Sequence, residues 1–233
     1  MVGVSAKSEI HVLAVITSRM TSQRLPGKAL IDVEQRPLLG RVIDRVRQSS
    51  RVTKILVATS SEDSDDPIAD FCSVESVPCF RGALRDTAGR LLAAAQSEDA
   101  TAFVRISGDS PLIDPQLVDE GIFLFSESSV DIVTNVFPRT FPAGQSVEVI
   151  ATDALVRLCS QQSDPVSREH VTAGFYAEPA AWRIVNFTSG EEGPHPSFTI
   201  DTLEDLRRME QVIRTVGDGP SDWRTLCTKV TRS

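Results

Sequence analysis

Cysteine and histidine are scarce in this sequence. Four cysteines and three histidines occur in 233 residues, and no two cysteines are spaced as a C-x-x-C pair. This composition argues against a zinc site. Isolated cysteines in a chain of this size are typical of reduced core residues, so we expect a cytoplasmic protein.

Long apolar runs and an excess of positive charge are also absent. No run approaches the ~18 apolar residues of a membrane span, and Glu9 and His11 interrupt the short N-terminal one, so we expect no signal peptide. The net charge is −8. Because nucleic acids and membrane surfaces attract positively charged proteins, we expect neither as a partner. Any polyanion that binds must therefore meet a local basic cluster.

Glycine-rich phosphate-binding motifs are missing as well, since neither G-x-G-x-x-G nor G-x-x-x-x-G-K-[ST] occurs. A different basic loop follows the first apolar segment, with Arg19, Arg24 and Lys28 spaced R-x₄-R-x₃-K. Arginine offers a planar fork to phosphate oxygens and lysine a point charge, and Pro26 and Gly27 favour a sharp turn. The loop is a candidate for triphosphate binding; the alternative is a solvated surface loop.

Strand-like and helix-like segments alternate in the first half of the chain. The strands are expected at 11–18, 54–60, 77–82 and 102–114, the last ending in a turn, and the helices at 37–49, 66–75, 87–97 and 115–128. This alternation predicts a parallel sheet with helices on both faces. Ligands of such sheets lie at the carboxyl ends of the strands, where the basic loop also begins.

The second half of the chain reads differently. Two strands are expected at 130–136 and 146–150, with a proline-rich excursion at 137–145 between them. A helix at 153–162, the stretch 167–177, a strand at 182–188, the stretch 197–201 and a final helix at 203–216 follow. The composition shows no break, repeat or linker, so we predict a single domain over 1–233. Its core is expected at about 11–216, and the tail 217–233 has room for one last turn at SDWRTL.

The stretch RISGDSP places polar side chains at the end of a predicted strand. Alternate residues of a strand share a face, so Arg105, Ser107 and Asp109 are expected on one side, while Gly108 lets a ligand approach the backbone. Asp109 would then stand at the carboxyl edge of the sheet. The alternative is an ordinary turn aspartate before Pro111.

A second aspartate precedes the last predicted helix. Thr202 and Asp205 are spaced like a capping box, which accounts for both. Asp201, just before the cap, is expected at a strand end and is not accounted for. Mg²⁺ typically takes one or two carboxylates from the protein, so Asp109 and Asp201 are candidate Mg²⁺ ligands.

Together these stretches make the sequence resemble the CTP-dependent cytidylyltransferases. The resemblance points to the spore-coat polysaccharide (SpsF-like) branch, which is related to the Kdo and acylneuraminate cytidylyltransferases. The matching segments follow the family order over about residues 11–216, and they include RLPGK, GDSPLIDP, FPAGQSVEVI, SREHVT and DTLEDL. The resemblance implies a nucleotide-diphospho-sugar transferase-like α/β/α sandwich, with a mostly parallel sheet and an antiparallel element in the second half.

The resemblance also implies roles for individual residues. Arg19, Arg24 and Lys28 match the loop that grips the CTP phosphates, and Asp109 and Asp201 match the carboxylates that hold Mg²⁺. Arg19, Lys28 and Asp109 are the expected catalytic residues.

Other matches concern the base and the acceptor. Ser107 falls where Kdo enzymes carry a glutamine facing cytosine, so the mode of base recognition is open, and Arg81 falls in a loop near the nucleotide. The residues expected on the acceptor side are Glu148, Arg168, Glu169 and His170, with Arg139 and Arg168 as the cations for an anionic acceptor. For Glu169 and His170 the alternative is a polar pair at a helix start.

The expected reaction is transfer of CMP from CTP to a small anionic acceptor, with Mg²⁺ as cofactor and pyrophosphate as product. The sequence does not distinguish a sugar acid, a sugar phosphate, a phosphonate or another small anion as the acceptor. The alternatives are a guanylyl- or uridylyltransferase of the same fold and a non-catalytic nucleotide-binding protein. The resemblance further implies a role in polysaccharide biosynthesis and a homodimer.

Overall fold

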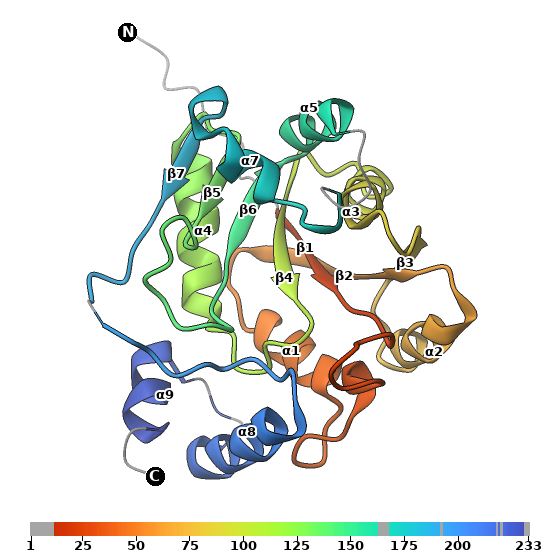
Figure 1. Ribbon diagram of the computed structural model, residues 1–233, viewed down its shortest axis with the longest axis vertical. Helices are drawn as coiled ribbons and strands as arrows, with labels where there is room; N and C mark the ends of the chain where they lie inside the picture. The colour runs from red at the N-terminus through yellow and green to blue at the C-terminus, as the bar shows by residue number, and fades with distance from the viewer. Residues whose placement is uncertain (1–11, 163–167, 192, 218, 220, 231–233) are drawn as a thin grey trace, which may run out of the picture.

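One mixed β-sheet organises the protein (Figure 1). The computed structural model describes residues 12–230 except 163–167, 192, 218 and 220. Within these residues, seven strands form a single sheet. Their order is β3 (Cys79–Gly82), β2 (Val52–Ser60), β1 (Val12–Thr17), β4 (Ala102–Ser107), β6 (Glu148–Ala151), β5 (Ile132–Thr134) and β7 (Ile184–Asn186).

The strand directions agree with the predicted fold class. The pairs β1–β2, β1–β4, β2–β3 and β5–β7 are parallel, whereas β6 runs antiparallel to both of its neighbours, β4 and β5. The antiparallel element therefore lies in the second half of the chain, as expected, and the predicted mostly parallel sheet with helices around it is confirmed.

Helices cover both faces of this sheet (Figure 1). The helices of the described residues are α1 (Leu38–Val46), α2 (Asp66–Val74), α3 (Thr87–Gln96), α4 (Pro115–Glu127), α5 (Thr152–Gln161), α7 (Ala173–Ala177), α8 (Leu203–Val216) and α9 (Trp223–Val230). Of these, α8 packs away from the sheet, in a third apolar cluster with Leu38, Phe198 and Ile200. In the part of the chain that the structure describes, no helix has the length and apolarity needed to cross a membrane.

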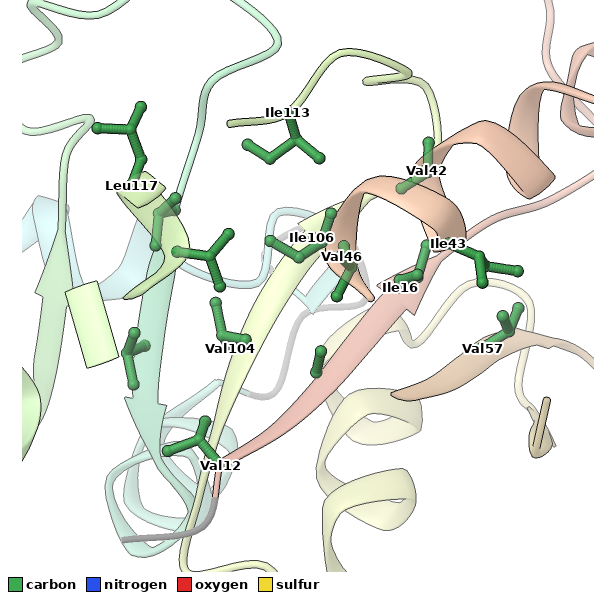
Figure 2. Packing of buried hydrophobic residues seen from close by; sticks show 14 of the residues in the cluster. Val12, Ile16, Val42, Ile43, Val46, Val57, Val104, Ile106, Ile113 and Leu117 are labelled. Carbon is green, nitrogen blue, oxygen red and sulfur yellow. The ribbon is translucent and has the colours of Figure 1, made fainter. Parts of the chain in front are cut away.

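Strand β1 shows why the chain forms three layers. Val12, Ala14 and Ile16 pack into the apolar cluster beneath α1, α2 and α4, whereas Leu13 and Val15 belong to the cluster beneath α3 and α5. Figure 2 shows the first of these clusters, with valines and isoleucines of β1, β2 and β4 facing the side chains of α1. A continuous apolar run is the pattern of a strand buried on both faces.

Two segments differ from the sequence-based expectation. Residues 197–201 form an extended segment outside the sheet, because their backbone pairs with loops: Phe198 N donates to Ala143 O and Ile200 N to Asp109 O. Asp201 therefore does not stand at a strand end. Strand β4 ends at Ser107, ahead of Asp109. His11 and Ser167, placed in predicted elements, lie outside the described residues.

The C-terminal region forms the helix α9 rather than a single turn. Trp223 and Leu226 are spaced to share one helix face, and both are buried. The Trp223 backbone N–H donates to Asp114 Oδ2 at 3.0 Å, which ties the start of α9 to the start of α4. Residues 218, 220 and 231–233 of the predicted tail lie outside the described residues.

Candidate active site

A cavity of about 930 Å³ opens at the carboxyl ends of β1 and β4. Gly108 allows these two strand ends to approach each other: its N–H donates to Thr17 O at 2.9 Å, and a Cβ there would meet Thr17 O at 2.7 Å. The cavity is lined by the basic loop after β1, by the segment before α3, by β4 and by Glu169 and His170. Four regions distant in sequence therefore share one cavity.

The basic loop is fixed by a buried carboxylate that sequence reasoning missed. Asp65, fully buried, accepts from Met20 N at 2.8 Å and from Thr59 Oγ1 and Ser60 N at 3.0 Å. Burial alone would raise the pKa of Asp65, but the hydrogen bonds from Ser60, Met20 and Thr59 outweigh it and lower the pKa. The only signal was the acidic run DSDD before Pro67, which does not reveal which aspartate is buried.

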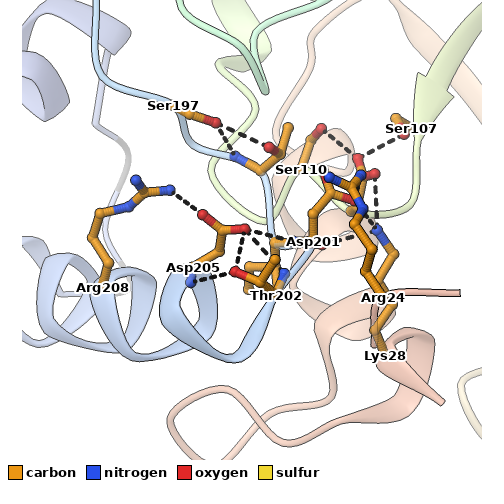
Figure 3. Close-up of polar contacts among 12 residues, drawn as sticks. Arg24, Lys28, Ser107, Ser110, Ser197, Asp201, Thr202, Asp205 and Arg208 are labelled. Atoms are coloured by element: carbon orange, nitrogen blue, oxygen red, sulfur yellow. Dashed lines mark hydrogen bonds and ion pairs between the residues drawn. The ribbon is translucent and has the colours of Figure 1, made fainter. Parts of the chain in front are cut away.

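Lys28 lies between the two predicted metal-binding aspartates. Its ammonium contacts Asp109 Oδ2 at 3.2 Å, Asp201 Oδ1 at 2.8 Å and Ile200 O at 2.9 Å. Figure 3 shows Lys28 and Arg24 side by side next to Asp201, and the Arg24 guanidinium pairs with Asp201 at 2.9 Å. The structure thus brings four of the sequence-predicted residues together from three parts of the chain.

The position of Asp201 depends on the segments around it. The predicted capping box is present: Thr202 Oγ1 accepts from Asp205 N, and Asp205 Oδ2 accepts from Thr202 N, which fixes the start of α8. Gly144, at φ 92°, lets the backbone of Phe198 pass within 2.7 Å of where a Cβ would stand. The extended segment can therefore lie against Asp109 and carry Asp201 to Lys28.

Arg19 is paired in the same way as the other two loop cations. Its guanidinium contacts Glu169 Oε1 at 3.2 Å and Leu84 O at 3.4 Å. Glu169 and His170 both line the cavity, so the structure places this predicted acceptor-side pair beside the basic loop. Each of the three cations thus has a carboxylate partner within the protein.

The oxygens around Lys28 fit a divalent cation. Asp109, Asp201 and the Ile200 carbonyl direct three oxygens at one point, and an oxygen-only ligand set is the type that Mg²⁺ prefers. No cluster of three or more His, Cys, Asp or Glu side chains suited to a metal occurs among the described residues. A metal held here would therefore depend on water or substrate oxygens for the rest of its ligands.

Ser107 lines the cavity and donates to Asp109 Oδ1 at 2.7 Å. Arg105, on the same face of β4, also lines the cavity and forms an ion pair with Glu148. Glu148 itself is buried and does not line the cavity, so its expected place on the acceptor side stays a prediction. Its other oxygen accepts from Tyr176 Oη at 2.7 Å, and burial raises the pKa of Tyr176, which keeps that hydroxyl protonated.

Three predicted arginines do not line the cavity. Arg81 donates to Ser60 O and Glu62 O, Arg139 donates to Ser146 Oγ, and Arg168 pairs with Asp86 at 2.8 Å. Arg168 also donates to two backbone carbonyl oxygens. Because these contacts hold the guanidinium groups to neighbouring loops, their assignment to nucleotide or acceptor binding stays a prediction that the cavity does not support.

Comparisons with known proteins agree on one family. The sequence model of the cytidylyltransferase family matches residues 13–220. The spore coat polysaccharide biosynthesis protein SpsF of Bacillus subtilis is 29% identical over 216 residues, covering 90% of this chain and 89% of that protein. The 3-deoxy-manno-octulosonate cytidylyltransferase of Chloroherpeton thalassium is 33% identical over 215 residues, covering 87% and 84%.

A solved structure supports the same relationship. The cytidylyltransferase of Leptospira borgpetersenii superposes with a TM-score of 0.90 at 27% identity, covering 95% of this chain and 94% of that one. The agreement extends over nearly the whole chain.

Proposed function

Because this chain belongs to the cytidylyltransferase family, we propose that it transfers CMP from CTP to a small anionic acceptor and releases pyrophosphate. The observation that carries the proposal is the convergence of Arg19, Arg24 and Lys28 on one cavity with Asp109. Transfer of this kind needs little covalent chemistry from the protein and depends on positioning and charge stabilisation.

The three loop cations are the groups that bind the triphosphate. Arg19 and Arg24 present guanidinium forks and Lys28 a point charge, so together they neutralise the phosphates that leave as pyrophosphate. Gly108 and the Asp65 contact to Met20 N hold the loop close to Asp109. These residues orient the α-phosphate and lower the cost of the charge that builds up on the leaving group.

Enzymes of this family are generally metal-dependent, and we assign Mg²⁺ to Asp109 and Asp201. When bound there, Mg²⁺ would supply positive charge to the phosphate oxygens. The Ile200 carbonyl and both carboxylates contact the same Lys28 ammonium, and the Asp201 N–H donates to Asp205 Oδ2 of the capping box, which fixes the backbone there.

The acceptor would bind beyond the phosphates, where Glu169 and His170 line the cavity. Arg85 also lines the cavity and is exposed, so it supplies positive charge for a carboxylate or phosphate of the acceptor. It takes this role in place of Arg139 and Arg168, which do not line the cavity. A sugar acid, a sugar phosphate or a phosphonate each satisfies this arrangement.

Two alternatives remain distinguishable by experiment. Thermal stabilisation by CTP, UTP, GTP and ATP with Mg²⁺ separates a cytidylyltransferase from the same fold with another nucleotide. Release of pyrophosphate from CTP in a screen of small anions separates an enzyme from a non-catalytic nucleotide-binding protein. Stabilisation by CTP above the other nucleotides, with acceptor-dependent pyrophosphate release, is the expected result.

Replacing Arg24 by alanine should weaken CTP binding far more than it weakens the fold. The Arg24 side chain is 65% exposed, so the free energy of unfolding should change by less than about 0.5 kcal/mol. Loss of a charge-assisted bond to phosphate should cost about 1.5–3 kcal/mol, or roughly tenfold to more than a hundredfold in affinity. Calorimetry with CTP and Mg²⁺, beside the melting temperature, measures both.

The matched control is Arg207→Ala, which removes an exposed arginine of α8 outside the cavity. It should leave CTP affinity unchanged. Equal affinities for the Arg24 and Arg207 variants would show that Arg24 does not bind the triphosphate.

The quaternary structure and the pathway stay predictions of the family resemblance, and the location stays a prediction from the cysteine composition. A homodimer should appear as a mass near twice that of the chain in sedimentation at micromolar concentration, and a purely monomeric profile would contradict it. The cytoplasmic location and the role in polysaccharide biosynthesis require evidence from cells.

A further inference from the structure

Lys28 occupies the point that the two metal-binding carboxylates share. Its ammonium has three hydrogen-bond donors, and it has three oxygen partners: Asp109, Asp201 and the Ile200 carbonyl. The side chain is only 14% exposed. This lysine is therefore enclosed among the same oxygens that fit a divalent cation.

The charges in this cluster are already balanced without a metal. Asp109 and Asp201 carry two negative charges, and Lys28 and Arg24, which pairs with Asp201, carry two positive ones. A divalent cation among the same oxygens would lie next to the ammonium, and like charges in contact repel strongly away from bulk water. Lys28 and a divalent cation cannot occupy this point together.

We infer that the Lys28 ammonium occupies the divalent-cation position until a triphosphate binds and attracts it to the phosphates. The metal and CTP would therefore bind together rather than independently. This inference deepens the proposed function and rests on its assignment of Asp109 and Asp201 to the metal. The lysine stem is long and flexible, and Lys28 belongs to the same basic loop as Arg19 and Arg24. A triphosphate bound by that loop offers Lys28 new anionic partners and leaves both carboxylates to the metal.

The test measures metal binding without nucleotide, using Mn²⁺ as the probe and electron paramagnetic resonance to count free ions. Wild-type protein should bind Mn²⁺ weakly, and Lys28→Met should bind it at least about tenfold more tightly, because the competing charge is gone. Lys28→Met combined with Asp109→Asn should lose this gain, which locates the ion at the carboxylates.

The matched control is Lys54→Met, which removes a lysine that also pairs with a carboxylate, Glu98, but outside the cavity. It should leave Mn²⁺ affinity at the wild-type value, since the change in net charge alone is not the cause. Lys28→Gln provides a second neutral variant, and melting curves show which variants are folded. Equal Mn²⁺ affinity of wild type and both folded Lys28 variants overturns the inference, as does tight Mn²⁺ binding by wild-type protein alone.

A separate measurement distinguishes failure of the proposed function from failure of the inference about Lys28. Calorimetry of wild-type protein with CTP in the presence of a chelator tests nucleotide binding without any metal. If CTP does not bind under any metal condition, the proposed function fails, whatever the Mn²⁺ affinities are. If CTP binds but wild-type protein also binds Mn²⁺ tightly by itself, the proposed function stands and the role of Lys28 in excluding the metal fails.

Discussion

Asp109→Asn should reduce turnover of CTP at least about a hundredfold, which corresponds to about 2.7 kcal/mol of transition-state stabilisation. The substitution keeps the shape of the side chain but removes one of the two carboxylate charges beside Lys28. A neutral amide is a much weaker ligand for a divalent cation than a carboxylate, so the charge that stabilises the reacting phosphates is lost. Steady-state pyrophosphate release at limiting Mg²⁺ measures the effect.

Asp201→Asn should have a similar effect, because both carboxylates contact the same ammonium and are assigned the same role. Both side chains are about one quarter exposed, so the folded state should survive, as melting curves can verify. Asp70→Asn, which changes an exposed aspartate of α2 outside the cavity, is the matched control. Near-wild-type turnover of either Asp109→Asn or Asp201→Asn would remove that residue from the metal site.

Asp65→Asn should destabilise the protein by about 3 kcal/mol or more, which is typical of breaking a buried hydrogen-bonded charge network. The Asp65 carboxylate accepts from the N–H groups of Met20 and Ser60 and from two hydroxyls. An asparagine amide NH₂ placed there would be a hydrogen-bond donor, and the N–H and hydroxyl groups around it are donors as well. For a chain of this length the melting temperature should fall by roughly 6–12 °C.

The contribution of Asp65 to the free energy of unfolding should decrease as the solution becomes acidic. The pKa of Asp65 is lowered in the folded protein, so its stabilising contribution is fully present above the unfolded-state pKa of about 4. It is lost as pH falls through the lower folded-state value. The difference in stability between wild type and Asp65→Asn should therefore be constant near neutral pH and narrow in acid.

Asp63→Asn is the matched control for this prediction, because Asp63 is an exposed member of the same acidic run. It should leave the melting temperature nearly unchanged. If Asp63→Asn and Asp65→Asn melt at the same temperature, Asp65 does not anchor the basic loop through Met20.

Sequence alone determined most of the fold, because the signals for strands and helices are local. The continuous apolar run at β1 and the helical spacing in α1 each reflect which faces of one element are buried. The capping box at Thr202 and Asp205 is read from residues three positions apart. The basic loop and Asp109 were likewise identified from short motifs and from the rule that ligands meet the carboxyl ends of parallel strands.

Tertiary structure alone decided which of these charged groups meet. Lys28 and Asp201 are 173 positions apart, and their contact depends on an extended segment that pairs with loops rather than with the sheet. Asp65 differs from its acidic neighbours only in being buried beneath the basic loop, and Arg168 differs from Arg19 only in having its donors held outside the cavity. Charged side chains carry no periodic pattern that predicts their partners, because an ion pair depends on distances set by the packing of the whole chain.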